Sequence, residues 1–169
     1  DTLEQDSNEN GFATWTPAME SEFERRRGYS MRPWLLALTG AVVDSPEETD
    51  RFLWDYRRTL GDLHAAYFAK KQRELCHGRG LAFKAQAYGP FNFYADGLEM
   101  AGATDIPMGE CWTDPGLSIS CRGNALWTLK QAASAAHLYG KSRAASESWA
   151  QIPASFSKDF FALKSTADL

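Results

Sequence analysis

The sequence predicts an α/β protein that forms part of a (β/α)8 TIM-type barrel, about its fourth to seventh β/α units, with parallel strands. Three short apolar segments, residues 81–88, 104–112 and 142–149, are predicted strands, and each is reached through a helical stretch. Alternation of strands with helices favours a parallel sheet with right-handed crossovers. Each segment ends in a polar or carboxylate residue beside aromatic residues. A carboxylate at the end of a buried strand is costly to desolvate and usually faces a cleft, so the pattern indicates the active face of a barrel.

The N-terminal part of the chain is predicted to be a loop followed by two helices. Residues 1–12 are polar and predict a loop, although the first four residues also resemble the tip of a preceding strand. Thr16 stands before a proline, which suits an N-cap followed by the first helical residue. This helix is expected to end at Gly28. Residues 32–43 predict a short helix and a turn.

The longest predicted helix begins at Ser45, which is followed by a proline and, three residues on, by Glu48. This spacing is typical of a capping box. Large apolar residues then recur at three- and four-residue steps, which predicts one continuous apolar face. The members of this face are Phe52, Tyr56, Leu60, Leu63, Tyr67 and Leu75. The helix is expected to end at the Gly-rich turn of residues 78–80.

The second half of the chain alternates the predicted strands with further helices. Helices are expected over residues 94–101, 124–139 and 155–167, and the Gly-, Ser- and Pro-rich residues 114–123 predict a loop. Three strands are fewer than the eight of a closed barrel, and a three-stranded sheet alone would have two open edges. We therefore expect residues 1–169 to be a partial (β/α)8 catalytic domain, with the remainder of the barrel and accessory domains outside this chain.

Composition narrows the class of ligand. The chain has 169 residues, of which 44% are hydrophobic and 24% charged, as expected of a globular domain. A net charge of −4 without a basic stripe argues against nucleic acid as a partner. No segment approaches the ~20 apolar residues of a membrane span, so no membrane partner is expected. Aromatic residues make up 13% of the chain and include six tryptophans. Tryptophans beside strand-end carboxylates indicate that the ligand is a sugar.

Six segments carry a resemblance to a known family. They are EFERRRGY (22–29), PWLLALTG (33–40), FLWDYRRTL (52–60), GLAFKAQAYG (80–89), DIPMGECW (105–112) and KQAASAAHLYG (130–140). In this order they resemble the catalytic barrel of the alpha-L-rhamnosidases of glycoside hydrolase family 106, over essentially the whole chain. Family members are much larger multidomain proteins, which agrees with a partial barrel. The resemblance implies inverting hydrolysis of terminal alpha-L-rhamnosides, a pair of catalytic glutamates and a calcium ion near the sugar.

Glu4 and Glu147 are the predicted catalytic pair. Glycosidases place two carboxyl groups across the scissile bond, one to protonate the leaving oxygen and one, in inverting enzymes, to activate water. Glu147 ends an apolar strand and is similar to the family's Ala-x-Glu motif; its alternative role is a salt bridge at the barrel rim. Glu4 resembles the family's Asp-Ser-x-Glu pattern, with Thr2 in place of serine; its alternative is a solvated loop acid. Analogy with other barrels makes Glu4 the proton donor.

Glu110 lies one predicted strand before Glu147 and has three open roles: calcium ligand, partner of sugar hydroxyls, or second catalytic acid. Calcium prefers several oxygen ligands, and the sequence contains no loop of the EF-hand type. The expectation of calcium, with Glu110 as a metal ligand, therefore comes from the resemblance alone.

Five further residues are predicted to contact the substrate. Gln86 and Tyr88 end a predicted strand and suit vicinal hydroxyl groups, with strand-end packing as their alternative. Trp112 and Trp149 would stack on the sugar or wall the core. Asp1 would bind sugar hydroxyls, an expectation that rests on the family pattern.

Two rival functions follow from the same residues. The first is a retaining glycosidase of another barrel family that uses the same two glutamates; the second is a catalytically silent carbohydrate-binding or structural fragment. The expected partners are a rhamnose-containing oligosaccharide or glycoside and the rest of the same polypeptide, without which the fragment is expected to be inactive. The expected location is periplasmic or secreted.

Overall fold

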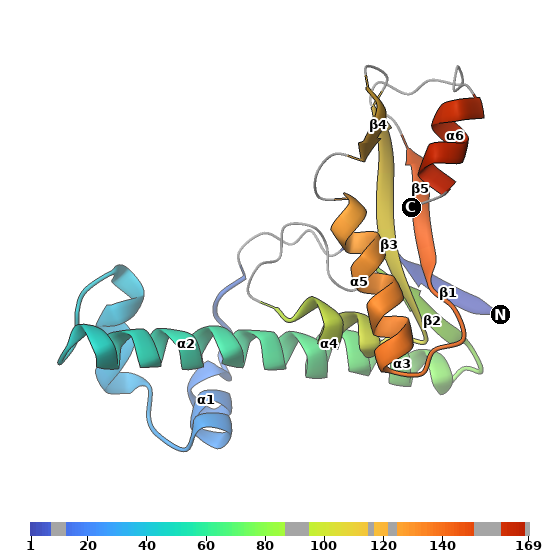
Figure 1. The fold of residues 1–169 in the computed structure, drawn as a ribbon. Coiled ribbons are helices and arrows are strands. Elements are labelled where there is room, and N and C mark those ends of the chain that lie inside the picture. The colour runs from blue at the N-terminus through green and yellow to red at the C-terminus, as the bar shows by residue number, and fades with distance from the viewer. Residues whose placement is uncertain (8–12, 87–94, 115–116, 122–124, 151–159, 168–169) are drawn as a thin grey trace.

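The structure, a computed structural model, describes residues 1–7, 13–86, 95–114, 117–121, 125–150 and 160–167 (Figure 1). In chain order the elements are β1 (Thr2–Gln5), α1 (Met19–Arg27), η1 (Arg32–Thr39), α2 (Pro46–Leu63), η2 (His64–Ala69), α3 (Lys70–His77), β2 (Ala82–Ala85), α4 (Gly97–Gly102), β3 (Ile106–Asp114), β4 (Leu117–Cys121), α5 (Ala125–Leu138), β5 (Ala145–Ala150) and α6 (Phe160–Ala167). η1 is a 3-10 helix and η2 is a π-helix.

Four strands form a parallel sheet in the order β1, β2, β3, β5. Each parallel strand pairs with the next parallel strand along the chain, and each connection contains at least one helix, which is the topology of successive β/α units. The predicted α/β class with parallel strands is confirmed, and the sheet has the arrangement expected of part of a barrel. The numbering of the units stays a prediction.

Two segments that were predicted as loops contain strands. Thr2–Gln5, inside the predicted loop 1–12, forms β1 and pairs with β2 along its whole length, in agreement with the alternative that the first residues are the tip of a strand. Leu117–Cys121, inside the predicted loop 114–123, forms β4 and pairs antiparallel with the end of β3. The two corrections have different causes. β1 is short and polar and is stabilised by its pairing with β2, whereas Leu117–Cys121 alternates apolar and polar residues, a strand signal that the Gly-, Ser- and Pro-rich surroundings outweighed in the prediction.

The predicted glycine at the end of α1 and the predicted serine at the start of α2 are both helix caps in the structure. Gly28 is left-handed, with φ 83°, and its N–H donates to the carbonyl of Glu24 at 2.8 Å, which ends α1. The Oγ of Ser45 accepts a 3.2 Å hydrogen bond from the N–H of Glu48 at the start of α2. The start of α1 differs from the prediction, because its N-cap is Ala18 rather than Thr16.

The long helix keeps its predicted apolar face over its first half only. Elements α2, η2 and α3 follow one another without a break and form the extended horizontal helix of Figure 1. Phe52, Tyr56 and Leu60 are buried as predicted. Tyr67 and Leu75, which the same periodicity placed on this face, are exposed instead. A single apolar face along the whole helix is therefore wrong.

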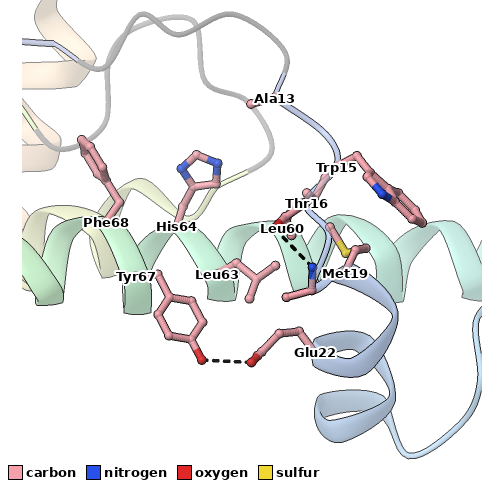
Figure 2. Close-up of a pocket in the computed structure, with 11 residues that line it drawn as sticks. Ala13, Trp15, Thr16, Met19, Glu22, Leu60, Leu63, His64, Tyr67 and Phe68 are labelled. Atoms are coloured by element: carbon pink, nitrogen blue, oxygen red, sulfur yellow. Dashed lines mark hydrogen bonds between the residues drawn. The ribbon is translucent and has the colours of Figure 1, made fainter.

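The buried face changes because the helix meets different neighbours along its length. Its first half packs against α1 and η1, whereas Tyr67 stays on the α1 side and donates a hydrogen bond to Glu22 at the surface (Figure 2). From the π-helical turn η2 onward, the helix buries Ala65, Ala69 and Cys76 on its other side. These residues pack against Phe83 and Ala85 of β2, so the second half of the helix covers the sheet.

A second hydrophobic cluster holds α1 and η1 against α2, beside the part of the long helix that does not cover the sheet (Figure 1). Its centre is aromatic: Phe23 meets Tyr29 edge to face at 5.0 Å between ring centroids and meets Phe52 at 5.7 Å. The cluster is completed by Met19, Met31, Ala37, Tyr56 and Leu60. In the described part of the chain, no helix is long and apolar enough to cross a membrane.

Asp105 ties α3 to the beginnings of β2 and β3. One carboxylate oxygen accepts from Arg73 Nε at 2.6 Å; the other accepts from the N–H of Phe83 at 2.9 Å and lies 2.7 Å from His77 Nε2. Partial burial by itself raises the pKa of Asp105, but the hydrogen bonds from Phe83, Arg73 and His77 outweigh it and lower this pKa to about 2. Asp105 is therefore ionised near neutral pH and serves as a structural anchor.

Candidate active site

The register of the sheet separates its residues onto two faces. Phe83 and Ala85 of β2 pack against helices, and the chain alternates, so Lys84 and Gln86 lie on the opposite face. On β3, a Cβ added to Gly109 would lie 2.6 Å from the carbonyl oxygen of Thr128 in α5, so Gly109 faces that helix. We call the face opposite these helices the inner face.

The predicted glutamates all lie on the inner face. Glu4 of β1 is the register partner of Lys84. Lys84 is in turn the partner of Ile106 on β3, so Glu110, four residues further along β3, lies on the same face. Glu110 and Glu147 are direct register partners on β3 and β5. Three acidic side chains from three strands of one parallel sheet therefore share one face, with Glu110 and Glu147 further along the strands than Glu4.

Gln86 and Glu147 are joined directly. Gln86 Nε2 donates a 2.9 Å hydrogen bond to Glu147 Oε2, and the residue is only 2% exposed. Since an amide nitrogen only donates, this contact presents an N–H to a carboxylate oxygen and fixes the position of the Glu147 head group. Gln86 was predicted to bind substrate; the structure places it next to the predicted catalytic carboxylate.

Lys84 is the residue of this face that the sequence reasoning missed. Its ammonium group forms an ion pair with the carboxylate of Glu4, the exposed member of the pair. A signal was present in the sequence, because Lys84 is a charged residue between Phe83 and Ala85 in an apolar strand. A cation in that position has to leave the helix-covered face and lie on the inner one.

The backbone of Glu110 is held from the helix side. Thr128 Oγ1 accepts from the Glu110 N–H and donates to the Glu110 carbonyl, each at 3.1 Å. A threonine of α5 thus satisfies both backbone groups of one residue in β3. This anchors the strand at the level where Glu110 and Glu147 stand side by side.

Trp149 stands beside an irregularity of β5. The pairing of β5 with β3 shifts between Cys111 and Trp112, so that Trp149 has no partner in the register. Trp149 has φ 66°, a left-handed conformation that is strained for a bulky residue, and its Nε1 donates to the carbonyl of Leu163 in α6 at 3.4 Å. The bulge begins directly after Glu147 and Ser148, where such irregularities re-aim side chains.

Of the remaining predicted contacts, Asp1 is described, and it is not brought to this group. Asp1 precedes β1 at the end opposite Gln5, and its carbonyl accepts from the N–H of Ala82 at 3.1 Å. Tyr88 and the side chain of Trp112 lie outside the part that the structure describes. Within that part, histidine, cysteine, aspartate and glutamate side chains form no group of three that could hold a metal ion.

The chain is similar to known proteins both in sequence and in structure. The family model for glycoside hydrolase 106, described as alpha-L-rhamnosidase, matches residues 1–169. A rhamnosidase from Novosphingobium sp. PP1Y has a similar solved structure, with 39% sequence identity and a TM-score of 0.78 over 89% of this chain and 14% of that one. A Formosa agariphila protein provisionally named beta-glucuronidase is 41% identical over 149 residues, which is 87% of this chain and 12% of that protein. The chain thus spans about one eighth of the length of these relatives.

Proposed function

The chain belongs to the glycoside hydrolase 106 family of alpha-L-rhamnosidases, and from this premise we propose that it is the part of a barrel that carries both catalytic carboxylates for hydrolysis of terminal alpha-L-rhamnosides. One observation supports this most directly: Glu4, Glu110 and Glu147 share the inner face of one parallel sheet. Side chains on this face, at or beyond the strand ends, are the ones that build the active sites of barrel enzymes.

Three strand intervals leave room between Glu4 and Glu147 for the water molecule that an inverting pair requires. Neighbouring strands lie about 4.8 Å apart, so the three intervals from β1 to β5 separate their backbones by roughly 14 Å along the sheet. Two glutamates that reach inward across a curved sheet shorten this gap toward the roughly 6.5–9.5 Å of an inverting pair. Glu110 and Glu147 stand only one interval apart, which is nearer to the roughly 5–5.5 Å of a retaining pair.

In the proposed mechanism Glu147 is the general base and Glu4 the proton donor. Glu147 accepts the proton of a water molecule that attacks the anomeric carbon, and the N–H of Gln86 suits the ionised carboxylate that this role requires. Glu4 protonates the glycosidic oxygen as the bond to the leaving group breaks. The ion pair between Glu4 and Lys84 corresponds to the state after proton donation, and it has to open when Glu4 takes up the next proton.

The calcium implied by the family would be held in part by Glu110. Carboxylate oxygens are the ligands that calcium prefers, and Glu110 has Glu147 as its register partner on the same face. Calcium takes six to eight oxygens, so most ligands would come from sugar hydroxyls, water and residues outside the described part. When bound, the ion would offset carboxylate charge and orient hydroxyl groups. We expect Glu110→Gln to weaken calcium binding by the full-length protein, measured by titration calorimetry, while Glu74→Gln on α3 leaves it unchanged.

The deciding experiment assays the full-length protein on p-nitrophenyl alpha-L-rhamnoside and, because of one relative's name, on p-nitrophenyl beta-glucuronide. We expect hydrolysis of the rhamnoside, with Glu147→Gln lowering kcat by roughly 10²–10⁴-fold at unchanged melting temperature. The control Glu74→Gln removes an exposed carboxylate outside the site and should leave kcat unchanged. Full activity of Glu147→Gln would show that Glu147 is not catalytic. Hydrolysis of the glucuronide but not of the rhamnoside would show that the proposed substrate is wrong.

Proton NMR of the first product tests the stereochemistry. An inverting enzyme releases beta-L-rhamnose from an alpha-glycoside, whereas first release of the alpha anomer would favour the retaining alternative. A folded full-length protein that hydrolyses neither glycoside would favour the silent carbohydrate-binding alternative. The periplasmic or secreted location stays a prediction.

A further inference from the structure

Strand β2 carries two hydrogen-bond donors on the inner face of the sheet. Lys84 and Gln86 are two residues apart, so both side chains leave the strand on the same side. The ammonium group of Lys84 contacts Glu4 on β1, and the amide of Gln86 donates to Glu147 on β5. Two alternate positions of one strand therefore contact the two carboxylates of the proposed catalytic pair, one each.

Lys84 is more buried than lysines that form ion pairs elsewhere in the chain. Its side chain is 26% exposed, whereas Lys70 and Lys71, which form ion pairs on the long helix, are 55% and 58% exposed. Its neighbours along the strand, Phe83 and Ala85, are completely buried. An ammonium group in this position loses part of its hydration, and a carboxylate partner offsets that loss. The contact with Glu4 is therefore part of a built arrangement on the inner face.

The contact also restricts where the Glu4 carboxyl group can lie. Glu4 and Lys84 are register partners on adjacent strands, so their backbones are one strand interval apart. The side chain of Glu4 is 54% exposed, which means that packing leaves much of its head group in solvent. An ammonium group held on the neighbouring strand limits the positions that this head group takes.

The charge of Lys84 favours one state of Glu4. A positive charge beside a carboxyl group stabilises the ionised carboxylate relative to the neutral acid. In the proposed mechanism Glu4 is a neutral acid before it donates its proton and a carboxylate afterwards. Lys84 therefore interacts more strongly with the product of the proton transfer than with its reactant. An interaction that grows as charge develops lowers the barrier to that step.

We propose that Lys84 is a positioning residue for the proton donor Glu4, which it holds in place and whose developing negative charge it stabilises. In this step the O–H bond of Glu4 breaks and an O–H bond forms on the glycosidic oxygen, which also keeps the electron pair of the broken C–O bond. Lys84 keeps its own proton throughout. The proposal rests on the proposed function and deepens it, because β2 then supports both members of the pair: Lys84 supports the donor and Gln86 supports the base.

A comparison of two leaving groups on the full-length protein tests this role. Methyl alpha-L-rhamnoside has a poor leaving group, whose oxygen needs a proton as the bond breaks, whereas dinitrophenyl alpha-L-rhamnoside releases a stable phenolate without one. Weaker support of the proton donor therefore slows the methyl glycoside more than the dinitrophenyl glycoside. Weaker support of the base slows both. Each variant is measured at its own pH optimum, so that kcat reports the chemical step and not the fraction of Glu4 that is protonated.

Two substitutions of Lys84 separate its charge from its size. Lys84→Met keeps a long unbranched side chain without the charge, and Lys84→Arg keeps the charge. We expect Lys84→Met to lower kcat for the methyl glycoside by about three- to tenfold more than for the dinitrophenyl glycoside, and Lys84→Arg to retain most of kcat for both. Lys71→Met is the matched control, because Lys71 pairs with Glu74 at 2.8 Å on α3, outside the site, and should leave both kcat values unchanged.

Three results would overturn the proposal. Unchanged kcat values in Lys84→Met would show that the contact has no part in the reaction. Equal losses on the two substrates would show that Lys84 acts on the sugar or on the fold, and a lower melting temperature would identify the fold. Equal losses in Lys84→Met and Lys84→Arg would show that the charge is not what matters.

Glu4→Gln in the same assay separates failure of this proposal from failure of the proposed function. If Glu4→Gln slows the methyl glycoside selectively and Lys84→Met does not, Glu4 remains the proton donor and the role of Lys84 is wrong. If Glu4→Gln slows both substrates equally, Glu4 is not the donor. If the wild-type protein hydrolyses neither substrate, the proposed function itself is wrong. In these last two cases the role of Lys84 is overturned together with the assignment on which it rests.

Discussion

Gln86 and Glu147 are joined by a 2.9 Å hydrogen bond although their strands, β2 and β5, are not neighbours in the sheet. β3 lies between them, so the two side chains meet over the inner face and cross above an intervening strand. A contact of this kind depends on the curvature and register of several strands at once. The position of the Glu147 carboxylate therefore depends on how β2, β3 and β5 are arranged together.

Removal of the amide donor is expected to disturb Glu147. Gln86→Ala deletes a hydrogen bond to a charged group, which is worth about 1.5–3 kcal/mol, so we expect kcat for rhamnoside hydrolysis to fall by roughly 10- to 100-fold. A double-mutant cycle with Glu147→Gln measures the coupling. If Gln86 acts through Glu147, the second substitution adds little to the first; additive losses would mean that Gln86 acts on the substrate directly.

Gly109 is expected to tolerate no side chain. A Cβ there would lie 2.6 Å from the Thr128 carbonyl oxygen, which is backbone and cannot rotate away. We expect Gly109→Ala to destabilise the full-length protein by about 1–3 kcal/mol in denaturant unfolding, because β3 and α5 must move apart. Gly78→Ala is the control, since its Cβ would meet nothing closer than 3.5 Å. Equal stability of the two variants would show that β3 and α5 are less closely packed than described.

The Asp105 anchor makes an acid-dependent contribution to stability. Its folded-state pKa of about 2 lies below the ordinary value of 3.8, so its stabilisation is complete above about pH 4 and is lost as the pH falls toward 2. We expect Asp105→Asn to lower the free energy of unfolding by about 1–2 kcal/mol at pH 7 and by much less at pH 2. Chemical unfolding at a series of pH values checks this. A loss that is the same at both pH values would contradict it.

Trp149 is expected to be strained in its left-handed conformation. Glycine adopts φ 66° without a steric cost, whereas alanine does not, so Trp149→Gly should be more stable than Trp149→Ala by about 1 kcal/mol. Both variants lose the indole, so both should raise KM for a rhamnoside if Trp149 contacts the sugar as predicted. Thermal unfolding gives the order of stability and kinetics gives KM. Greater stability of the alanine variant would argue against a left-handed residue here.

Sequence reasoning succeeded where the signal is local. Gly28 ends a helix and Ser45 begins one, because each conformation depends on the residue itself and its near neighbours. It failed at β4, where the composition of residues 114–123 predicted a loop although Leu117–Cys121 alternates apolar and polar residues; the pairing with β3 adds a stabilisation that the local sequence does not show.

The candidate site was predictable to a similar degree. Glu110 and Glu147 could be selected from their place in predicted strands and Glu4 from its resemblance to a family pattern, and the register puts all three on one face. The contact of Gln86 with Glu147 could not be predicted, since it requires the order of strands in space. Lys84 was missed because a lysine in a strand was not weighed as part of the site, although alternation alone assigns it to the inner face.

The π turn also has a consequence for how relatives of this chain are aligned. Residues 46–77 look like one uninterrupted helix. Beyond η2, however, each side chain points in a different direction around the helix axis from the one it would have in a regular α-helix. A homologue with one residue fewer between His64 and Ala69 would return to the regular count. The residues beyond the turn, such as the buried Cys76, would then lie on a different side of the helix. A gap of a single position in this helix is therefore a change of architecture, because it changes which side chains face the sheet.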